Sequence, residues 1–372
     1  MGIEIRPYSA DRVPAVRAFN QRLREGGEKL FSLPEQAVSE WLPPAAGEEL
    51  FEECFLAHDG PEVRGGYVLK HQPFWVNGAI AAVGCPYSPI SEGLVNPRFG
   101  RVGLQLLLDA MKRKPTLYAL GMGGSGNAFP QVLKGLGWAL CDLPFFFRIV
   151  RPARFCRNFR YAERFRFGRA ACGILAATGT GWLGVKLVNA VRTRAPRNER
   201  ELSWTLVPEF GDCVDAIWQA AHTNYSLTAV RDRAALTRLY PRDAAKFLRL
   251  EVSRGGTCVG WAVALDTQMQ DHKFFGAARL GSLIDCFALP GSEHDVVHAV
   301  TQLLQGRRVD VIVTNQAHQS WCRALTRAGW LSGTSNFAFA ASPALATRLA
   351  PLEEHRPRLH LTRSDGEGPS HL

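Results

Sequence analysis

The 372-residue sequence lacks closely spaced cysteines and long hydrophobic runs. Its nine cysteines are scattered, and the closest two, Cys141 and Cys156, are 15 positions apart, so no CxxC or zinc-ribbon spacing exists. Such an odd, scattered set is typical of reduced thiols in a cytoplasmic protein. The first residues carry no apolar segment or cleavage site, which argues against secretion. The uncharged run at residues 170–185, which follows a series of arginines, is shorter than the roughly 20 residues that cross a bilayer.

The sequence also lacks excess charge outside one segment. The formal net charge is +10, and residues 151–200 alone hold 12 Lys and Arg against 2 Asp and Glu. Arginines and aromatic residues alternate from Arg151 to Arg169, and the uncharged run follows. This pattern fits a solvated linker, a segment that lies on an anionic membrane surface, or a nucleic-acid contact. Nucleic acid is the least favoured, because no RNP, KH or zinc-finger signature is present and a glycine-rich apolar run suits lipid better.

An internal repeat organises the rest of the chain. Residues 3–150 and 202–341 each open with a short strand ending at a proline, continue into a helix, and end in strand, helix, Gly-Trp, strand. The two copies align on Gly137-Trp138 and Gly329-Trp330. Strands with intervening helices predict the α/β (α+β) class for each copy. The expected organisation is a first domain at 1–150, a basic aromatic and apolar linker at 151–200, a second domain at 201–345, and a polar C-terminal tail at 346–372.

The segment SEGLVNPRFGRVGLQLLLDAM, residues 91–111, resembles the GCN5-related N-acetyltransferases (GNAT). In that family a central strand ends at a Val-x-Pro-x-aromatic turn, and the amides of a glycine-rich loop and the next helix cradle the pyrophosphate of acyl-CoA. The loop departs from the family pattern at Gly100 and Gln105, and Arg101 restores a positive charge. The helix is expected to bury Leu104, Leu107, Leu108 and Met111. The resemblance implies these cofactor-binding residues: Val95, Pro97, Phe99, Gly100, Arg101, Val102, Gly103, Leu104 and Asn127.

The resemblance also implies two tandem GNAT-like domains, each a mixed, mostly antiparallel sheet flanked by helices, as in the Fem aminoacyltransferases. The family's usual general-acid tyrosine is replaced by Leu133 in the first copy and by Leu325 in the second. In the second copy, the strand before Pro290 runs into a helix without a phosphate loop. We therefore expect acetyl-CoA or another acyl-CoA to bind only the first copy.

Acyl transfer to an amine needs a group that accepts the ammonium proton. Glu92 lies just before the cofactor turn, where family members place a carboxylate or histidine, and partial burial is expected to raise its pKa. Tyr87 and Ser88 are expected to line the opening of the same active-site cleft. These three residues are the catalytic candidates.

The sequence thus predicts an N-acyltransferase that is cytoplasmic or peripheral to the inner membrane. Its acceptor would be a small-molecule amine such as an amino sugar, an amino-acid conjugate or an envelope-polymer precursor. Two alternatives stay open: a non-catalytic GNAT-like binding or scaffold protein, and a Fem-like aminoacyltransferase that uses tRNA.

Two other motifs resemble known binding sites, one for a dinucleotide and one for zinc. Gly121, Gly123 and Gly126 mimic a dinucleotide fingerprint, but the following helix is short and carries Pro130, so a glycine loop beside the cleft is the better interpretation. His294 and His298 have the spacing of two zinc ligands, but they are expected to project into solvent from the polar face of a helix. No metal is expected.

Overall fold

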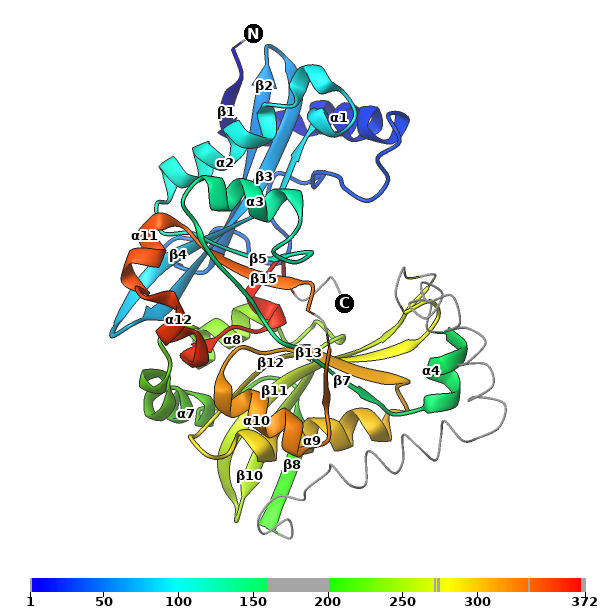
Figure 1. Cartoon of the computed structure of the whole chain (residues 1–372), viewed down its shortest axis with the longest axis vertical. Coiled ribbons are helices and arrows are strands. Elements are labelled where there is room, and N and C mark those ends of the chain that lie inside the picture. The colour runs from blue at the N-terminus through cyan, green and yellow to red at the C-terminus, as the bar shows by residue number, and fades with distance from the viewer. Residues whose placement is uncertain (1, 159–200, 271, 273–274, 334, 369–372) are drawn as a thin grey trace. The chain divides into compact units, whose positions relative to one another are not determined.

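The computed structural model describes residues 2–158, 201–270, 272, 275–333 and 335–368. The chain forms two compact units (Figure 1). Unit 1 comprises Met1–Asp142 and Ala338–His355, and unit 2 comprises Leu143–Phe337 and Arg356–Leu372. Both units are therefore discontinuous in sequence, in contrast to the continuous ranges expected above.

Unit 1 is built on strands that pair mainly in the antiparallel sense. The first four strands pair in sequence order, and the backbone of Gly84 in the fourth forms a parallel bridge with Leu117. The order continues from β5 through β15 to β6. The strands are β1 (Glu4–Pro7), β2 (Phe51–Asp59), β3 (Glu62–Val76), β4 (Ala79–Ser91), β5 (Tyr118–Met122), β15 (Phe337–Ala341) and β6 (Ala139–Asp142).

Helices cover both faces of this sheet. On one face, α1 (Val13–Glu25) buries Val16, Phe19 and Leu23 against inward residues of β2 and β3. On the other face, α2 (Val102–Arg113) and α3 (Ala128–Gly135) pack on the alternate residues of the same strands, such as Phe55 and Leu69. Both faces are buried because successive side chains of a strand point to opposite sides of the sheet. The remaining helices are α11 (Pro343–Arg348) and α12 (Leu352–His355).

Unit 2 has a mixed sheet, and of its seven described strands only β12 and β13 are parallel neighbours. Its order is β14 (Leu331–Gly333), β7 (Phe145–Ile149), β13 (Val311–Asn315), β12 (Arg279–Ala288), β11 (Thr257–Gln268), β10 (Leu248–Arg254) and β8 (Leu202–Val207). The helices in the described residues of this unit are α4 (Pro152–Asn158), α7 (Cys213–Ala221), α8 (Arg233–Leu239), α9 (Glu293–Gly306) and α10 (Gln319–Arg327).

The two units repeat one strand order, which supports the internal repeat. In each unit, one strand comes from the other half of the sequence: β7 lies between β13 and β14, and β15 lies between β5 and β6. Each is the second strand after the Gly-Trp pair of its own copy: β7 follows β6, and β15 follows β14. The two copies have therefore exchanged equivalent strands, and this exchange makes both units discontinuous.

The segment expected as a polar tail contributes to the interior of unit 2. Leu359 and His360 form β16, which pairs in parallel with β9 (Leu227–Ala229). Asp365, which is 2% exposed, accepts a hydrogen bond of 2.8 Å from the buried guanidinium of Arg231. A buried arginine needs carboxylate partners, and this segment supplies one of them.

No helix in the described part of the chain is long and apolar enough to span a membrane. Of the basic segment 151–200, the structure describes only the start, which forms α4, and residues 201 onward resume with β8. The linker, membrane and nucleic-acid interpretations of residues 159–200 therefore lie outside the described residues.

Candidate functional site

The turn between β4 and α2 in unit 1 is fixed by short-range contacts. After β4 the chain forms two short helices, η2 (Glu92–Leu94) and η3 (Pro97–Phe99), before α2 begins at Val102. The Asn96 side chain accepts a hydrogen bond from the Arg98 amide at 3.1 Å, and the Phe99 ring is buried in the core. The start of α2 is thus held in place by its flanking residues.

The N-terminus of α2 combines uncapped amides with positive charge. The first amides of any helix lack intrahelical partners, and here Arg101 provides no side-chain cap and the first turn holds no acid. Arg98 and Arg101 are exposed beside it. A Cβ added at Gly103 would meet only the Ser91 hydroxyl, at 3.6 Å, so the backbone is open to approach. Amides, helix dipole and arginines together favour an anion.

The expected cofactor-binding residues fall into two places. Residues 95–104 form one continuous turn, in which Pro97, Gly100 and Leu104 are exposed and Phe99 and Val102 are core residues. Asn127 lies apart, at the start of α3, where its side-chain amide donates to the carbonyl of Met122 at 3.2 Å. It secures the glycine loop that precedes α3, in which Gly121, Gly123 and Gly124 have positive φ.

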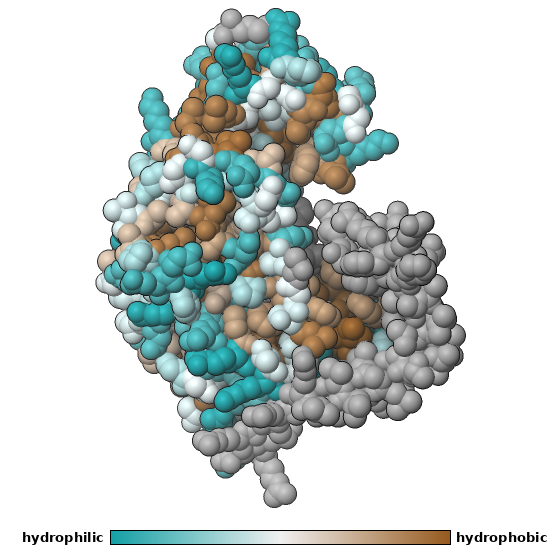
Figure 2. All heavy atoms as spheres, viewed as in Figure 1, coloured by the Kyte–Doolittle hydropathy of each residue, from teal (hydrophilic) through white to brown (hydrophobic). Residues whose placement is uncertain are grey.

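The expected buried face of α2 is partly wrong. Leu107 is buried and Met111 packs against the core, but Leu104 and Leu108 are 43% and 45% exposed. Figure 2 shows hydrophobic side chains on the surface over α2 and α3, where Val132 is also exposed. The helix instead buries Val102, Leu106, Leu107 and Ala110. Apolar residues of α2 lie on most sides of the helix, so their spacing in the sequence does not show which side is buried.

Glu92 is a buried member of an ion-pair cluster. Its Oε2 atom accepts hydrogen bonds from Arg64 at 2.9 Å and from Arg22 at 3.0 Å, and the residue is 4% exposed. Burial by itself raises the pKa, but the hydrogen bonds from Arg22 and Arg64 outweigh it, so the pKa of Glu92 lies below its usual value. The expectation of a raised pKa is therefore wrong, because long-range contacts decide it.

Tyr87 and Ser88 are not brought to Glu92. The Tyr87 hydroxyl donates to Glu52 Oε1 at 2.7 Å, and burial together with that carboxylate raises the pKa of Tyr87 far above its usual value. Ser88 adopts a left-handed backbone conformation with φ +48°. Within the described residues, the three catalytic candidates thus share a strand end but form no acid–base pair with one another.

The start of α9 in unit 2 is equivalent to the start of α2 in unit 1, but it carries acidic instead of basic residues. The first turn of α9 contains Glu293 and Asp295, and the Glu293 carboxylate accepts a hydrogen bond from the Gly291 amide at 2.9 Å. This occupied amide and the negative charge disfavour a phosphate. His294 and His298 are half-buried on this helix, so the expectation that both are solvated is wrong. Across the described residues, no cluster of three His, Cys, Asp or Glu could hold a metal ion.

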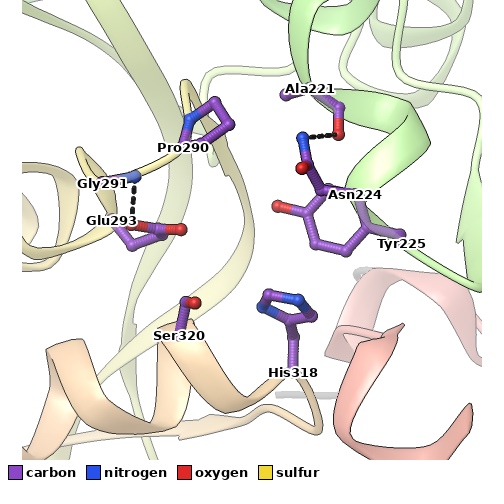
Figure 3. A pocket seen from close by; sticks show the side chains of 8 residues that line it. All are labelled: Ala221, Asn224, Tyr225, Pro290, Gly291, Glu293, His318 and Ser320. Carbon is purple, nitrogen blue, oxygen red and sulfur yellow. Dashed lines mark hydrogen bonds between the residues drawn. The ribbon is translucent and has the colours of Figure 1, made fainter.

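Sequence reasoning missed a pocket of about 230 Å³ in unit 2 (Figure 3). It lies beside the start of α9 and the start of α10. Its lining residues are Ala221, Asn224, Tyr225, Pro290, Gly291, Glu293, His318 and Ser320. The available signal was His318, a polar residue between a strand and a helix near the end of the second copy, which is a common position for site residues in α/β folds.

Solved structures share this fold across most of the chain. A GCN5-related N-acetyltransferase from Anabaena variabilis matches 91% of this chain and 72% of its own, with 8% identity and a TM-score of 0.54. A probable N-acyltransferase from Enterococcus faecalis matches 94% and 75%, with 9% identity and a TM-score of 0.53. The N-myristoyltransferase of Saccharomyces cerevisiae, solved with bound myristoyl-CoA and inhibitors, matches 91% and 79%, with 9% identity and a TM-score of 0.52. No family model and no curated protein matches the sequence.

These likenesses confirm the fold expected from the sequence. The chain has a tandem GNAT fold, with two units that are each built on a mixed, mostly antiparallel sheet flanked by helices. At 8% to 9% identity the comparisons concern the fold.

Proposed function

We propose that the protein is an N-acyltransferase that binds acyl-CoA at the start of α2 in unit 1 and transfers the acyl group to an amine. The observation that carries the proposal is the contrast between two equivalent helices. The start of α2 has uncapped amides, exposed arginines and no acid, whereas the start of α9 has two acids and an occupied amide. Only the first suits a pyrophosphate.

The amides at Val102, Gly103 and Leu104 would hold the pyrophosphate, and Arg98 and Arg101 would add positive charge. When bound, acyl-CoA supplies a thioester carbonyl that an amine can attack, with release of the CoA thiol. The missing side chain of Gly103 leaves room for the phosphates to approach the backbone.

Glu92 acts in this proposal as a positioning residue. Its ion pairs connect the end of β4 to Arg22 of α1 and Arg64 of β3, and Arg22 also donates to the Val63 carbonyl at 2.6 Å. These contacts hold the segment that leads into the cofactor turn. A carboxylate with a lowered pKa that is bonded to two arginines is a poor proton acceptor.

One observation favours a second candidate function, a binding protein without catalysis. Glu92 is engaged by arginines, and the family's acid position holds the buried Leu133. Such a protein would bind acyl-CoA without turning it over.

A combined binding and turnover assay distinguishes the two. The intact protein is melted with CoA, acetyl-CoA and a long-chain acyl-CoA, and thiol release from acetyl-CoA is then followed with a panel of primary amines. We expect acyl-CoA to raise the melting temperature and at least one amine to accelerate thiol release. Stabilisation without amine-dependent release supports the binding protein, and no stabilisation by any acyl-CoA contradicts both candidates.

A further inference from the structure

The unit 2 pocket lies beyond the carboxyl ends of β12 and β13, which are parallel neighbours. Pro290 and Gly291 follow β12, His318 follows β13, and Asn224 and Tyr225 close the third side (Figure 3). Crevices at the carboxyl ends of parallel strands are common ligand sites in α/β folds. Its volume of about 230 Å³ is below the range of drug-sized pockets, so it suits a small head group.

His318 points into this pocket with an unsatisfied ring atom (Figure 3). The residue is 8% exposed, and its Nδ1 atom forms no hydrogen bond with any described residue. Burial, together with the nearby charges of Arg358 and Arg323, lowers the pKa of His318 to about 4. The ring is therefore neutral at pH 7 and offers one acceptor nitrogen.

Two further acceptors face the same space. Glu293 is 9% exposed and uses Oε2 to accept from the Gly291 amide, while its other oxygen points into the pocket (Figure 3). The side-chain amide of Asn224 donates to the Ala221 carbonyl at 3.0 Å, which leaves its Oδ1 as an acceptor. The pocket thus combines several acceptors with one carboxyl group, and no Lys or Arg lines it.

We propose that this pocket binds the primary ammonium group of a small amine. An ammonium group carries three N–H donors and a positive charge, which match the Glu293 carboxylate, the neutral His318 ring and the Asn224 oxygen. The same carboxylate repels an anion. This inference goes beyond the proposed acyltransferase function, because the pocket lies in unit 2 and acyl-CoA is proposed to bind unit 1.

The test uses ligand-observed saturation-transfer NMR on the full chain with glycinamide as the probe. N-acetylglycinamide, in which the amine is blocked, is the matched compound. We expect saturation of glycinamide and none of N-acetylglycinamide. Glu293→Gln should weaken glycinamide binding by about tenfold or more, because a charge-assisted hydrogen bond is lost. The control Glu209→Gln, at an exposed glutamate of the same unit, should bind like the wild type.

A second measurement keeps the proposal testable if the Glu293→Gln variant does not fold. In the wild-type protein, glycinamide should shift the imidazole resonances of His318, and His318→Phe should remove binding while the protein keeps a cooperative melt. Equal binding of both compounds, no binding of glycinamide to the wild type, or wild-type affinity in Glu293→Gln overturns the proposal. The assay contains no acyl-CoA, so a separate acetyl-CoA titration tells whether the acyltransferase proposal fails with it.

Discussion

The carboxylate of Glu92 lies between the guanidinium groups of Arg22 and Arg64. Both arginines donate to its Oε2 atom, at 3.0 Å and 2.9 Å. Arg22 comes from α1 and Arg64 from β3, so one side chain joins three elements at the end of β4. This geometry gives Glu92 a role in stability and loop position.

Replacing Glu92 by Gln should destabilise the protein by about 1 to 3 kcal/mol, because two partly buried guanidinium groups lose the charge of a buried carboxylate. Glu62→Gln is the matched control, since Glu62 pairs with the same Arg64 but is 51% exposed. It should cost no more than about 1 kcal/mol. Urea unfolding at pH 7 measures both. Equal stability of Glu92→Gln and the wild type would contradict the role assigned to this ion pair.

The pH dependence of the same variant has a defined sign. Because the pKa of Glu92 is lower in the folded protein than its usual 4.5, the unfolded chain binds the proton more readily in acid. The stabilisation is thus present above pH 4.5 and is lost as pH falls through the folded pKa. We expect the stability difference between wild type and Glu92→Gln to shrink below pH 4.5. A difference that stays constant to pH 3 would argue against this explanation.

The C-terminal segment should be essential for the stability of unit 2. Asp365 and Asp285 flank Arg231, and all three side chains are at most 2% exposed. Asp365→Ala leaves a buried guanidinium short of one partner and should cost about 3 to 5 kcal/mol. Asp212→Ala breaks a pair with Arg233 in which Asp212 is 88% exposed, and should change little. Thermal melts of the two variants compare them, and equal melting temperatures would refute the buried role.

If the basic segment 151–200 acts at a membrane, binding should depend on lipid charge and salt. Each well-placed basic residue contributes about 1 kcal/mol near an anionic surface, and added salt screens this attraction. Flotation of the intact protein with vesicles that contain or lack anionic lipid measures the effect. Equal flotation with both vesicle types, or none with either, leaves the linker interpretation.

The local patterns of the sequence predict most of the fold. The aligned pairs Gly137-Trp138 and Gly329-Trp330 reveal the repeat, and the first strand and helix of each copy lie where the sequence places them. The strand exchange is not predictable from these patterns. Phe145–Ile149 is an aromatic strand that fits either sheet, and its partner β13 lies more than 150 positions further along the chain.

The candidate site is predictable only as far as its chemistry is local. The turn at 95–104 and the start of α2 follow from a contiguous motif. The pKa of Glu92 depends on arginines 70 and 28 positions away, which no local pattern specifies. The pocket at His318 likewise combines residues from around 224, 293 and 318. The sequence can suggest each of these residues singly, but it does not show that they lie close together in the fold.

The central claim is that acyl-CoA binds at the start of α2, and calorimetric titration with acetyl-CoA tests it most directly. Gly103→Asp places a negative charge beside the expected pyrophosphate and should weaken binding by at least about tenfold. Gly103→Asn has nearly the same size without the charge and should lose less, while Gly135→Asp, at an open position at the end of α3, should bind like the wild type. Wild-type affinity in Gly103→Asp, or an equal loss in Gly135→Asp, would contradict the claim.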